Sequence, residues 1–274
     1  MDNLILTFGA ILLYLACSTL LFFNLKHAST GSTTVPGRLS RKQIIAMGIA
    51  ALCLHTLALS SSMINPMGID LGFYNAMSLV SAVIVLLILI AEWRYPVDIL
   101  AVVLLPVAAI SMLIDSFNTT HHILPPGSSN ELIFHILTSI IAYSILALAA
   151  LQAILLSIQN KFLHAHHPGG IIRLMPPLST MEILLFEFIV IGFIALTISL
   201  GSGIIFLDNM FAQQLVHKTI LSMIAWFVFL VLLVGRWKLG WRGRTAIRWT
   251  LTGFVSLMLA YFGSKFVLEI VLGQ

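Results

Sequence analysis

Three histidines lie inside long apolar stretches of this 274-residue sequence, where an ionisable side chain is costly and is therefore a candidate for function. They are His55, His135 and His217. The spacing predicts that His135 and His217 each lie about one helical turn inside the same end of a helical bundle, at a similar depth. His55 is expected to lie roughly 10 Å deeper, from the rise of about 1.5 Å per residue.

Two neutral imidazoles at matched depth are typical of the axial ligands of a b-type haem, a flat group that fills an apolar gap between helices. Ser139 and Tyr143 follow His135 at i+4 and i+8 and extend a polar stripe toward the bundle interior. The same histidines could instead form hydrogen bonds that hold helices together. Zinc is less favoured, because no third ligand of carboxylate or cysteine type is obvious.

The elements that must position these residues are membrane-spanning helices. Hydrophobic residues make up 59% of the chain and charged residues only 9%, against about 25% charged in soluble domains. This balance excludes a water-soluble enzyme and a nucleic-acid-binding protein. Long apolar runs predict an all-α, polytopic transmembrane bundle of about eight helices, forming a single transmembrane domain over residues 1–274. The predicted helices cover residues 4–25, 43–62, 71–91, 97–114, 131–158, 180–200, 213–234 and 247–270.

The basic residues predict the orientation of the bundle. Eleven of the fourteen Lys and Arg residues lie in the loops after the first, third, fifth and seventh predicted helices, Arg248 lies just inside the eighth, and the opposite loops contain none. These four loops are therefore expected to face the cytoplasm, with both termini external. No loop is long enough for a folded soluble domain, and no P-loop, GxSxG or HExxH motif is present, so we expect no enzyme activity.

The other polar residues have mainly structural interpretations. Ser179 and Glu182 match a capping box at the start of the sixth predicted helix, and Gly201-Ser202-Gly203 is expected to end it. Asn75 is expected to donate an interhelical hydrogen bond. Glu187 lies deeper and is expected to pair with a basic residue or to face a polar pocket.

Short motifs rich in glycine and aromatic residues are spread over residues 130–270. They are the stretch from His135 to Tyr143, Gly192-Phe193, Leu196-Thr197 with Gly201, Ala225-Trp226, Gly240 to Arg244, Gly253-Phe254, and Tyr261 to Glu269. Together they resemble the cytochrome c assembly (CcsA/CcmC-like) family of haem-handling membrane proteins, and most of all its HemX/YpjD branch. The first four predicted helices match that family by helix count only.

The resemblance implies a haem-handling bundle, with His135 at the family's first external haem-ligating histidine and His55 at a transmembrane histidine. Two family features are missing. The tryptophan-rich external segment with its WxWDPKE core is replaced by Gly203 to Phe211, which contains no tryptophan, and no second external histidine follows Glu269. Because these parts present haem to an apocytochrome, synthase activity is not expected. His217 lies near the end of the replaced segment and could supply the second axial ligand.

The sequence therefore predicts a multi-pass protein of the bacterial inner (plasma) membrane that binds haem b near the external face. His135 and His217 are the expected iron ligands, and His55 is a secondary candidate for cofactor binding. The protein is expected to contact the lipid bilayer and possibly a partner membrane protein, and no nucleic acid. The alternative is a haem-free accessory subunit of a membrane complex, for example an ion transporter. A secondary transporter that relays protons through Glu187 and the histidines is the third hypothesis.

Overall fold

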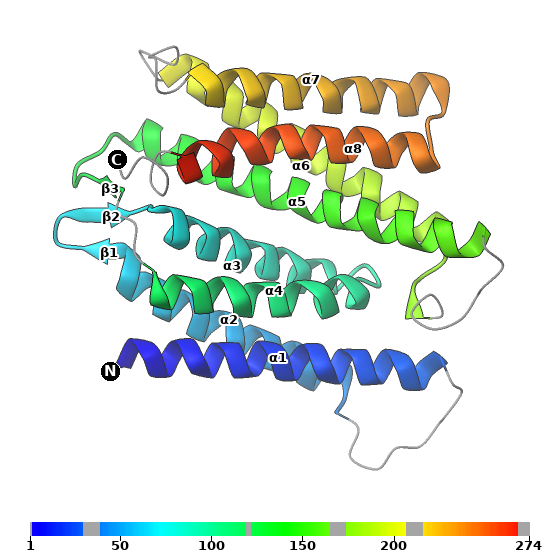
Figure 1. Cartoon of the computed structure of the whole chain (residues 1–274), viewed down its shortest axis with the longest axis horizontal. Helices are drawn as coiled ribbons and strands as arrows, with labels where there is room; N and C mark the ends of the chain where they lie inside the picture. The colour runs from blue at the N-terminus through cyan, green and yellow to red at the C-terminus, as the bar shows by residue number, and fades with distance from the viewer. Residues whose placement is uncertain (1, 30–38, 119–121, 165–173, 207–215, 268–274) are drawn as a thin grey trace. The chain divides into compact units, whose positions relative to one another are not determined.

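The chain is described from a computed structural model, which covers residues 2–29, 39–118, 122–164, 174–206 and 216–267 (Figure 1). Within these ranges it has eight α-helices, three short strands and one π-helical turn. The helices are α1 (Asp2–Ser29), α2 (Arg41–Met63), α3 (Phe73–Ala91), α4 (Asp98–Phe117), α5 (Asn130–His164), α6 (Leu178–Phe206), α7 (Val216–Leu239) and α8 (Gly243–Met258). The strands are β1 (Ile64–Asn65), β2 (Gly68–Asp70) and β3 (Ile123–Leu124), and the π-helical turn is η2 (Leu259–Gly263).

The predicted transmembrane bundle is confirmed. Helices α1 to α7 are each long and apolar enough to cross a membrane. Helix α8 has only 16 residues, but η2 continues it directly. The external position of both termini stays a prediction.

The described residues form two compact units. The first unit contains α1 to α4 with the three strands, and the second contains α5 to α8 with η2. The single transmembrane domain expected from the sequence stays a prediction.

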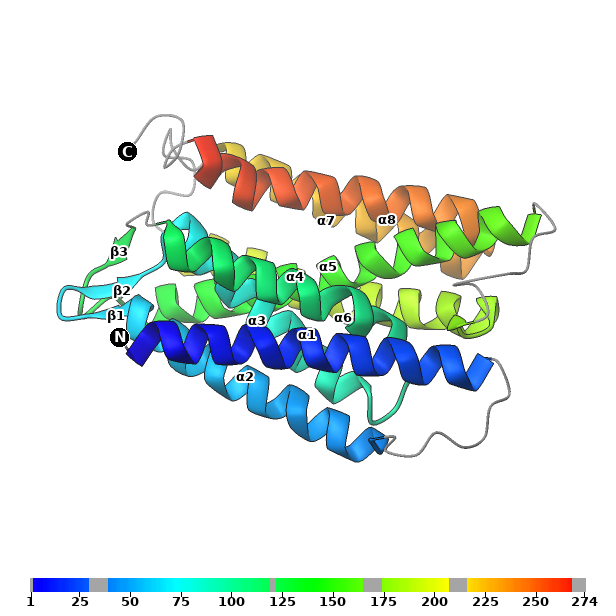
Figure 2. The same cartoon turned by 60° about the horizontal axis from the view of Figure 1, so that its bottom comes forward.

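In the first unit, α1 packs against both α2 and α4, and α3 packs against α2 and α4 (Figure 2). Polar side chains tie these helices together where the sequence is otherwise apolar. The Ser18 hydroxyl donates to the Val102 carbonyl of α4 at 2.8 Å. Asn75 of α3 forms an interhelical hydrogen bond with Ser62 of α2 at 3.2 Å, but Asn75 is the acceptor and not the donor that the sequence predicted. Helix α2 begins at a capping box formed by Ser40 and Gln43.

A three-stranded antiparallel sheet lies at one end of the first unit, which we call its sheet end. Strand β2 pairs with β1 on one side and with β3 on the other. Gly68 has a φ of +131°, and a side chain there would overlap the Leu124 carbonyl oxygen, so only glycine fits this position. The Asp70 carboxylate accepts hydrogen bonds from the backbone N–H groups of Gly72 and His122, both at 2.9 Å. These bonds hold the segment before β3 against the start of α3.

In the second unit, α5 packs along α6, and α8 packs against α5 and α7. The residues of the glycine and aromatic motifs meet at these contacts. Trp226 of α7 stacks on Phe193 of α6 with ring centroids 5.5 Å apart, and its indole N–H donates to the Thr197 hydroxyl at 2.9 Å. Gly192 lies against the Leu146 side chain of α5. The motif residues therefore form contacts between the helices of this unit.

Arg236, near the end of α7, holds that end of the helix against the start of α6. Its guanidinium donates to Glu182 of α6 at 3.1 Å and to the Trp241 carbonyl at 3.2 Å. It also lies 4.4 Å from the centre of the Phe186 ring. The prediction that Glu182 belongs to a capping box with Ser179 is not met, because α6 already begins at Leu178 and Glu182 pairs with Arg236.

The predicted end of the sixth helix is wrong. Helix α6 runs through Gly201-Ser202-Gly203 and ends at Phe206. Inside an apolar bundle a helix that unwinds leaves backbone N–H and C=O groups without water to bond, so glycines are tolerated there without ending the helix. The extension places Ser202 on the α6 face that meets α5.

Replacing Gly192 with alanine should destabilise the second unit by roughly 1–3 kcal/mol, because the added Cβ would lie 2.6 Å from the Leu146 side chain. The measurement is the apparent melting temperature of the detergent-solubilised protein. Gly201→Ala, in the same helix, is the matched control, because its Cβ would meet nothing within 4 Å. Equal melting temperatures for the two variants would contradict the packing described for α5 and α6.

Candidate functional site

His135 of α5 is held by two groups of α6. Its Nδ1 atom lies 3.0 Å from the Ser199 carbonyl oxygen and 3.0 Å from the Ser202 hydroxyl. A carbonyl oxygen only accepts, so the Nδ1–H must donate to it, and the neutral ring then carries its lone pair on Nε2. The Ser202 hydroxyl itself donates to the Ser199 carbonyl at 2.8 Å. His135 is thus a half-buried imidazole with a fixed orientation and an available Nε2.

The two residues of the polar stripe predicted after His135 face different neighbouring helices. Ser139 lies 2.7 Å from the Ser199 hydroxyl and donates to the His135 carbonyl, so it faces α6. Tyr143 instead packs among aromatic rings of α8 and η2, with centroid distances of 5.4 to 5.7 Å. The sequence missed Ser199 and Ser202 as partners of His135. Their i, i+3 spacing was the available signal, but it carries weight only once α6 is known to continue past Gly201.

His217 is exposed and is the second residue of α7. The predicted start of this helix at residue 213 lies outside the described residues, so the depth of His217 within its helix stays a prediction. In the part of the chain that the structure describes, no hydrogen bond or ring contact joins His217 to His135. Its role as a second ligand stays a prediction.

His55 of α2 is fully buried in the first unit, and both of its ring nitrogens are engaged. Nδ1 lies 3.2 Å from the Tyr14 hydroxyl and Nε2 lies 3.0 Å from the Ser78 hydroxyl. Tyr14 packs edge-on against the imidazole, with ring centroids 5.8 Å apart. A metal could bind His55 only if one of these hydrogen bonds broke.

Two further observations bear on metal binding and on Glu187. Across the described residues, no group of three or more His, Cys, Asp or Glu side chains could hold a metal ion. Glu187 of α6 has a buried Oε2 atom with no hydrogen-bond partner among those residues, so the basic partner expected for that oxygen is not found there.

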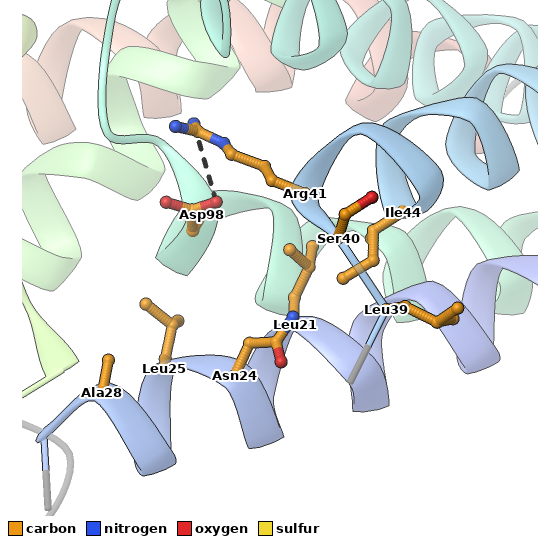
Figure 3. Close-up of a pocket in the computed structure, with 9 residues that line it drawn as sticks. All are labelled: Leu21, Asn24, Leu25, Ala28, Leu39, Ser40, Arg41, Ile44 and Asp98. Atoms are coloured by element: carbon orange, nitrogen blue, oxygen red, sulfur yellow. Dashed lines mark ion pairs between the residues drawn. The ribbon is translucent and has the colours of Figure 1, made fainter. Parts of the chain in front are cut away.

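A pocket of about 390 Å³ lies in the first unit beside the start of α2 (Figure 3). Its lining is mainly apolar, and at one side Arg41 and Asp98 form an ion pair at 3.7 Å. None of its lining residues is a histidine, so it offers no nitrogen ligand to haem. Nearby, Arg41 also donates to the backbone carbonyl of Glu92 at 3.3 Å, and the Glu92 carboxyl is buried.

The arrangement of apolar helices defines a multi-pass membrane protein. Comparison with known proteins then identifies the family: residues 43–272 match the family described as "Cytochrome C assembly protein", and the chain belongs to it. The chain is 32% identical over 249 residues to the inner membrane protein YpjD of Escherichia coli K12, covering 86% of this chain and 92% of that protein. The predicted family and multi-pass location in the inner membrane are thus confirmed.

A second relative is an uncharacterised 28.8 kDa protein of Azospirillum brasilense, named from its position in a nifR3-like 5′ region. It is 30% identical over 141 residues, which is 51% of this chain and 52% of that protein. No solved structure matches the chain.

Burial raises the pKa of Glu92, just beyond the end of α3, from 4.5 to about 7, with a further contribution from the Asp98 carboxylate and an opposing one from Arg41. Between these two values the folded chain binds more protons than the unfolded chain. The free energy of unfolding should therefore fall as pH rises through this window, by at most about 3 kcal/mol. Glu92→Gln should remove this dependence and melt at a higher temperature than the wild type above about pH 7.

The measurement is the apparent melting temperature of both proteins in detergent across the window from pH 4.5 to about 7. The two proteins should converge at the acid end, where Glu92 is neutral in both the folded and the unfolded chain. Curves that stay parallel over the whole window would show that burial of this carboxyl does not govern the response.

Proposed function

We propose that this protein binds b-type haem through Nε2 of His135 and has no synthase activity of its own. The observation that supports this proposal is the hydrogen bond from His135 Nδ1–H to the Ser199 carbonyl. Histidines that ligate metals generally donate their other ring N–H to a carbonyl or carboxylate, which fixes the tautomer and directs the lone pair. Membership of the cytochrome c assembly family supports the same cofactor.

The donor chemistry of the second unit suits haem better than a structural metal. A structural zinc site needs about four ligands, whereas haem iron needs one or two axial side chains, because the porphyrin supplies the other nitrogens. His135 is only half-buried, so its ring can be reached from outside the α5–α6 pair. The aromatic cluster around Tyr143 lies two turns further along α5 and adds apolar surface to the same helix.

His217 is the proposed second ligand. It belongs to the same unit, is exposed, and forms no hydrogen bond within the described residues that would have to break. Ligation by His217 requires the start of α7 to approach α5. His55 has both nitrogens engaged in the first unit, so the proposal gives it no ligand role.

When bound through histidine, a haem would supply reversible one-electron chemistry, or would itself be the cofactor that is passed on. The chain's own contribution is to position and polarise the imidazole. The Ser199 carbonyl accepts a hydrogen bond from Nδ1–H, which makes Nε2 a stronger electron-pair donor to a metal. The Ser202 hydroxyl lies within hydrogen-bonding distance of both the ring and that carbonyl. Ser139 links the Ser199 hydroxyl to α5 and holds the two helices in register.

The test is the visible spectrum of the purified protein after haem is supplied. The wild type should show a sharp Soret band, and His135→Ala should weaken haem binding by at least about tenfold. Ser202→Ala should weaken it by less than about tenfold, because the Ser199 carbonyl remains. His122→Ala, an exposed histidine of the first unit, is the matched control and should leave the spectrum unchanged.

Absence of a Soret band in the supplemented wild type would refute the proposal, as would a spectrum that neither His135→Ala nor His217→Ala alters. A haem-free preparation that retains a stoichiometric membrane partner would instead identify an accessory subunit. Loss of the band in His135→Ala with only a changed line shape in His217→Ala would assign a single strong ligand.

A further inference from the structure

The pocket beside the start of α2 lies where three membrane-spanning helices of the first unit begin or end. It is lined by the last turns of α1, by the start of α2, and by Asp98 at the start of α4 (Figure 3). The apolar spans of these helices are bounded at this end by Ala28, Arg41 and Asp98. The pocket is therefore at the end of the unit opposite the sheet end, at the level where a bilayer changes from hydrocarbon to headgroups.

The exposed side chains around this end are those of a membrane–water interface. Trp93, two residues beyond the end of α3, is 86% exposed. Lys26 of α1 and Lys42 of α2 are also exposed. Tryptophan and basic residues gather where a protein meets the headgroup layer, because their side chains combine an apolar part with a polar or charged tip. Phospholipid headgroups can therefore reach the pocket directly from the surrounding bilayer.

Two opposite charges face each other at one side of the pocket. The Arg41 guanidinium lies 3.7 Å from the Asp98 carboxylate, which is longer than a hydrogen bond, and the two side chains are 52% and 23% exposed. The same terminal nitrogen of Arg41 donates to the Glu92 carbonyl at 3.3 Å. Among the described residues, the other guanidinium N–H groups have no acceptor. This loose pair leaves donors on the cation and an oxygen on the carboxylate for a ligand.

A ligand that fits this pocket is apolar over much of its surface and carries a positive and a negative charge close together. Leu21, Leu25 and Leu39 supply apolar lining, and the volume of about 390 Å³ lies within the range of roughly 300–1,000 Å³ found for small-molecule pockets. A guanidinium matches the oxygens of a phosphate, and a carboxylate matches a primary ammonium. Phosphatidylethanolamine is the phospholipid class that carries both groups. A lipid with a phosphate alone would bring a second negative charge beside Asp98 with no cation to offset it.

We propose that this pocket binds one molecule of phosphatidylethanolamine from the surrounding membrane. Its phosphate lies on Arg41, its ammonium donates to Asp98, and its apolar part lies against the leucines of the lining. The headgroup thus satisfies both members of the ion pair at once. The site belongs to the first unit, is separate from the His135 site, and does not depend on haem.

The experiment titrates the full-length, haem-free protein in detergent with single lipids and counts bound molecules by native mass spectrometry. The probes are phosphatidylethanolamine, phosphatidylcholine and phosphatidylglycerol with identical acyl chains. Phosphatidylcholine keeps the phosphate and the positive charge but has no N–H to donate, and phosphatidylglycerol has no cation. Phosphatidylethanolamine should bind at least about fivefold more tightly than either, because only it makes both charged hydrogen bonds.

The two charged residues should fail in different ways when they are replaced. Asp98→Asn should bring the affinity for phosphatidylethanolamine down to that for phosphatidylcholine, because the neutral amide no longer attracts the ammonium. Arg41→Gln should weaken all three lipids by at least about fivefold, because the phosphate is common to them. Lys42→Gln, the matched control, removes an exposed charge from the next residue of α2, which does not line the pocket, and should leave the lipid preference unchanged.

A variant that fills the pocket without altering its charges separates cavity binding from surface attraction. Ala28→Trp places a large ring on the α1 side of the lining and should weaken phosphatidylethanolamine binding about as much as Arg41→Gln does. Glycerophosphoethanolamine, the same headgroup without acyl chains, should not displace the lipid, because it lacks the apolar part that the leucines contact.

Four results would overturn the proposal. Equal affinity for the three lipids would show that the headgroup is not recognised, and a preference that survives Asp98→Asn would remove the carboxylate from the site. Equal weakening by Lys42→Gln and Arg41→Gln would assign the lipid to general surface charge. Displacement by glycerophosphoethanolamine would assign the pocket to a soluble ligand. Because no haem is present in this experiment, none of these results bears on the His135 site.

Discussion

A polar side chain inside an apolar bundle must find its hydrogen-bond partner on another part of the protein, because no water is available to replace it. This constraint decides which helix faces meet in both units. In the first unit, Ser81 of α3 meets Ser111 of α4. In the second, Gln152 of α5 donates to the Met181 carbonyl of α6, and Ser256 of α8 donates to a carbonyl of α7. Apolar residues fill the remaining contacts, and they are less selective about register.

The same constraint gives two histidines different chemistry. His55 is surrounded by side-chain hydroxyls that can each donate or accept, so both of its nitrogens are engaged and its tautomer is free to change. His135 meets a backbone carbonyl, which can only accept, so its tautomer is fixed and Nε2 remains available. One arrangement ties three helices together and the other suits a metal ligand. The chemical identity of the residue is the same in both cases, and the partner makes the difference.

The family motifs describe how the helices of the second unit pack. Phe193 and Thr197 both contact Trp226, and Gly253 lies against the ring of Phe229. These contacts hold α6, α7 and α8 around α5, which presents His135. The bundle of the second unit is therefore held by contacts within the membrane-spanning helices.

The sequence by itself determined the number of helices, the membrane class and the family, because long apolar runs and motif residues are local features. It also singled out His135. It placed the end of α6 incorrectly, since glycine signals helix ends in water but not in an apolar bundle. Only the tertiary structure decided that Ser199 and Ser202 orient His135 and that Tyr14 and Ser78 engage the two ring nitrogens of His55. These partners lie tens of residues apart in the chain, and only the packing of the helices brings them within hydrogen-bonding distance.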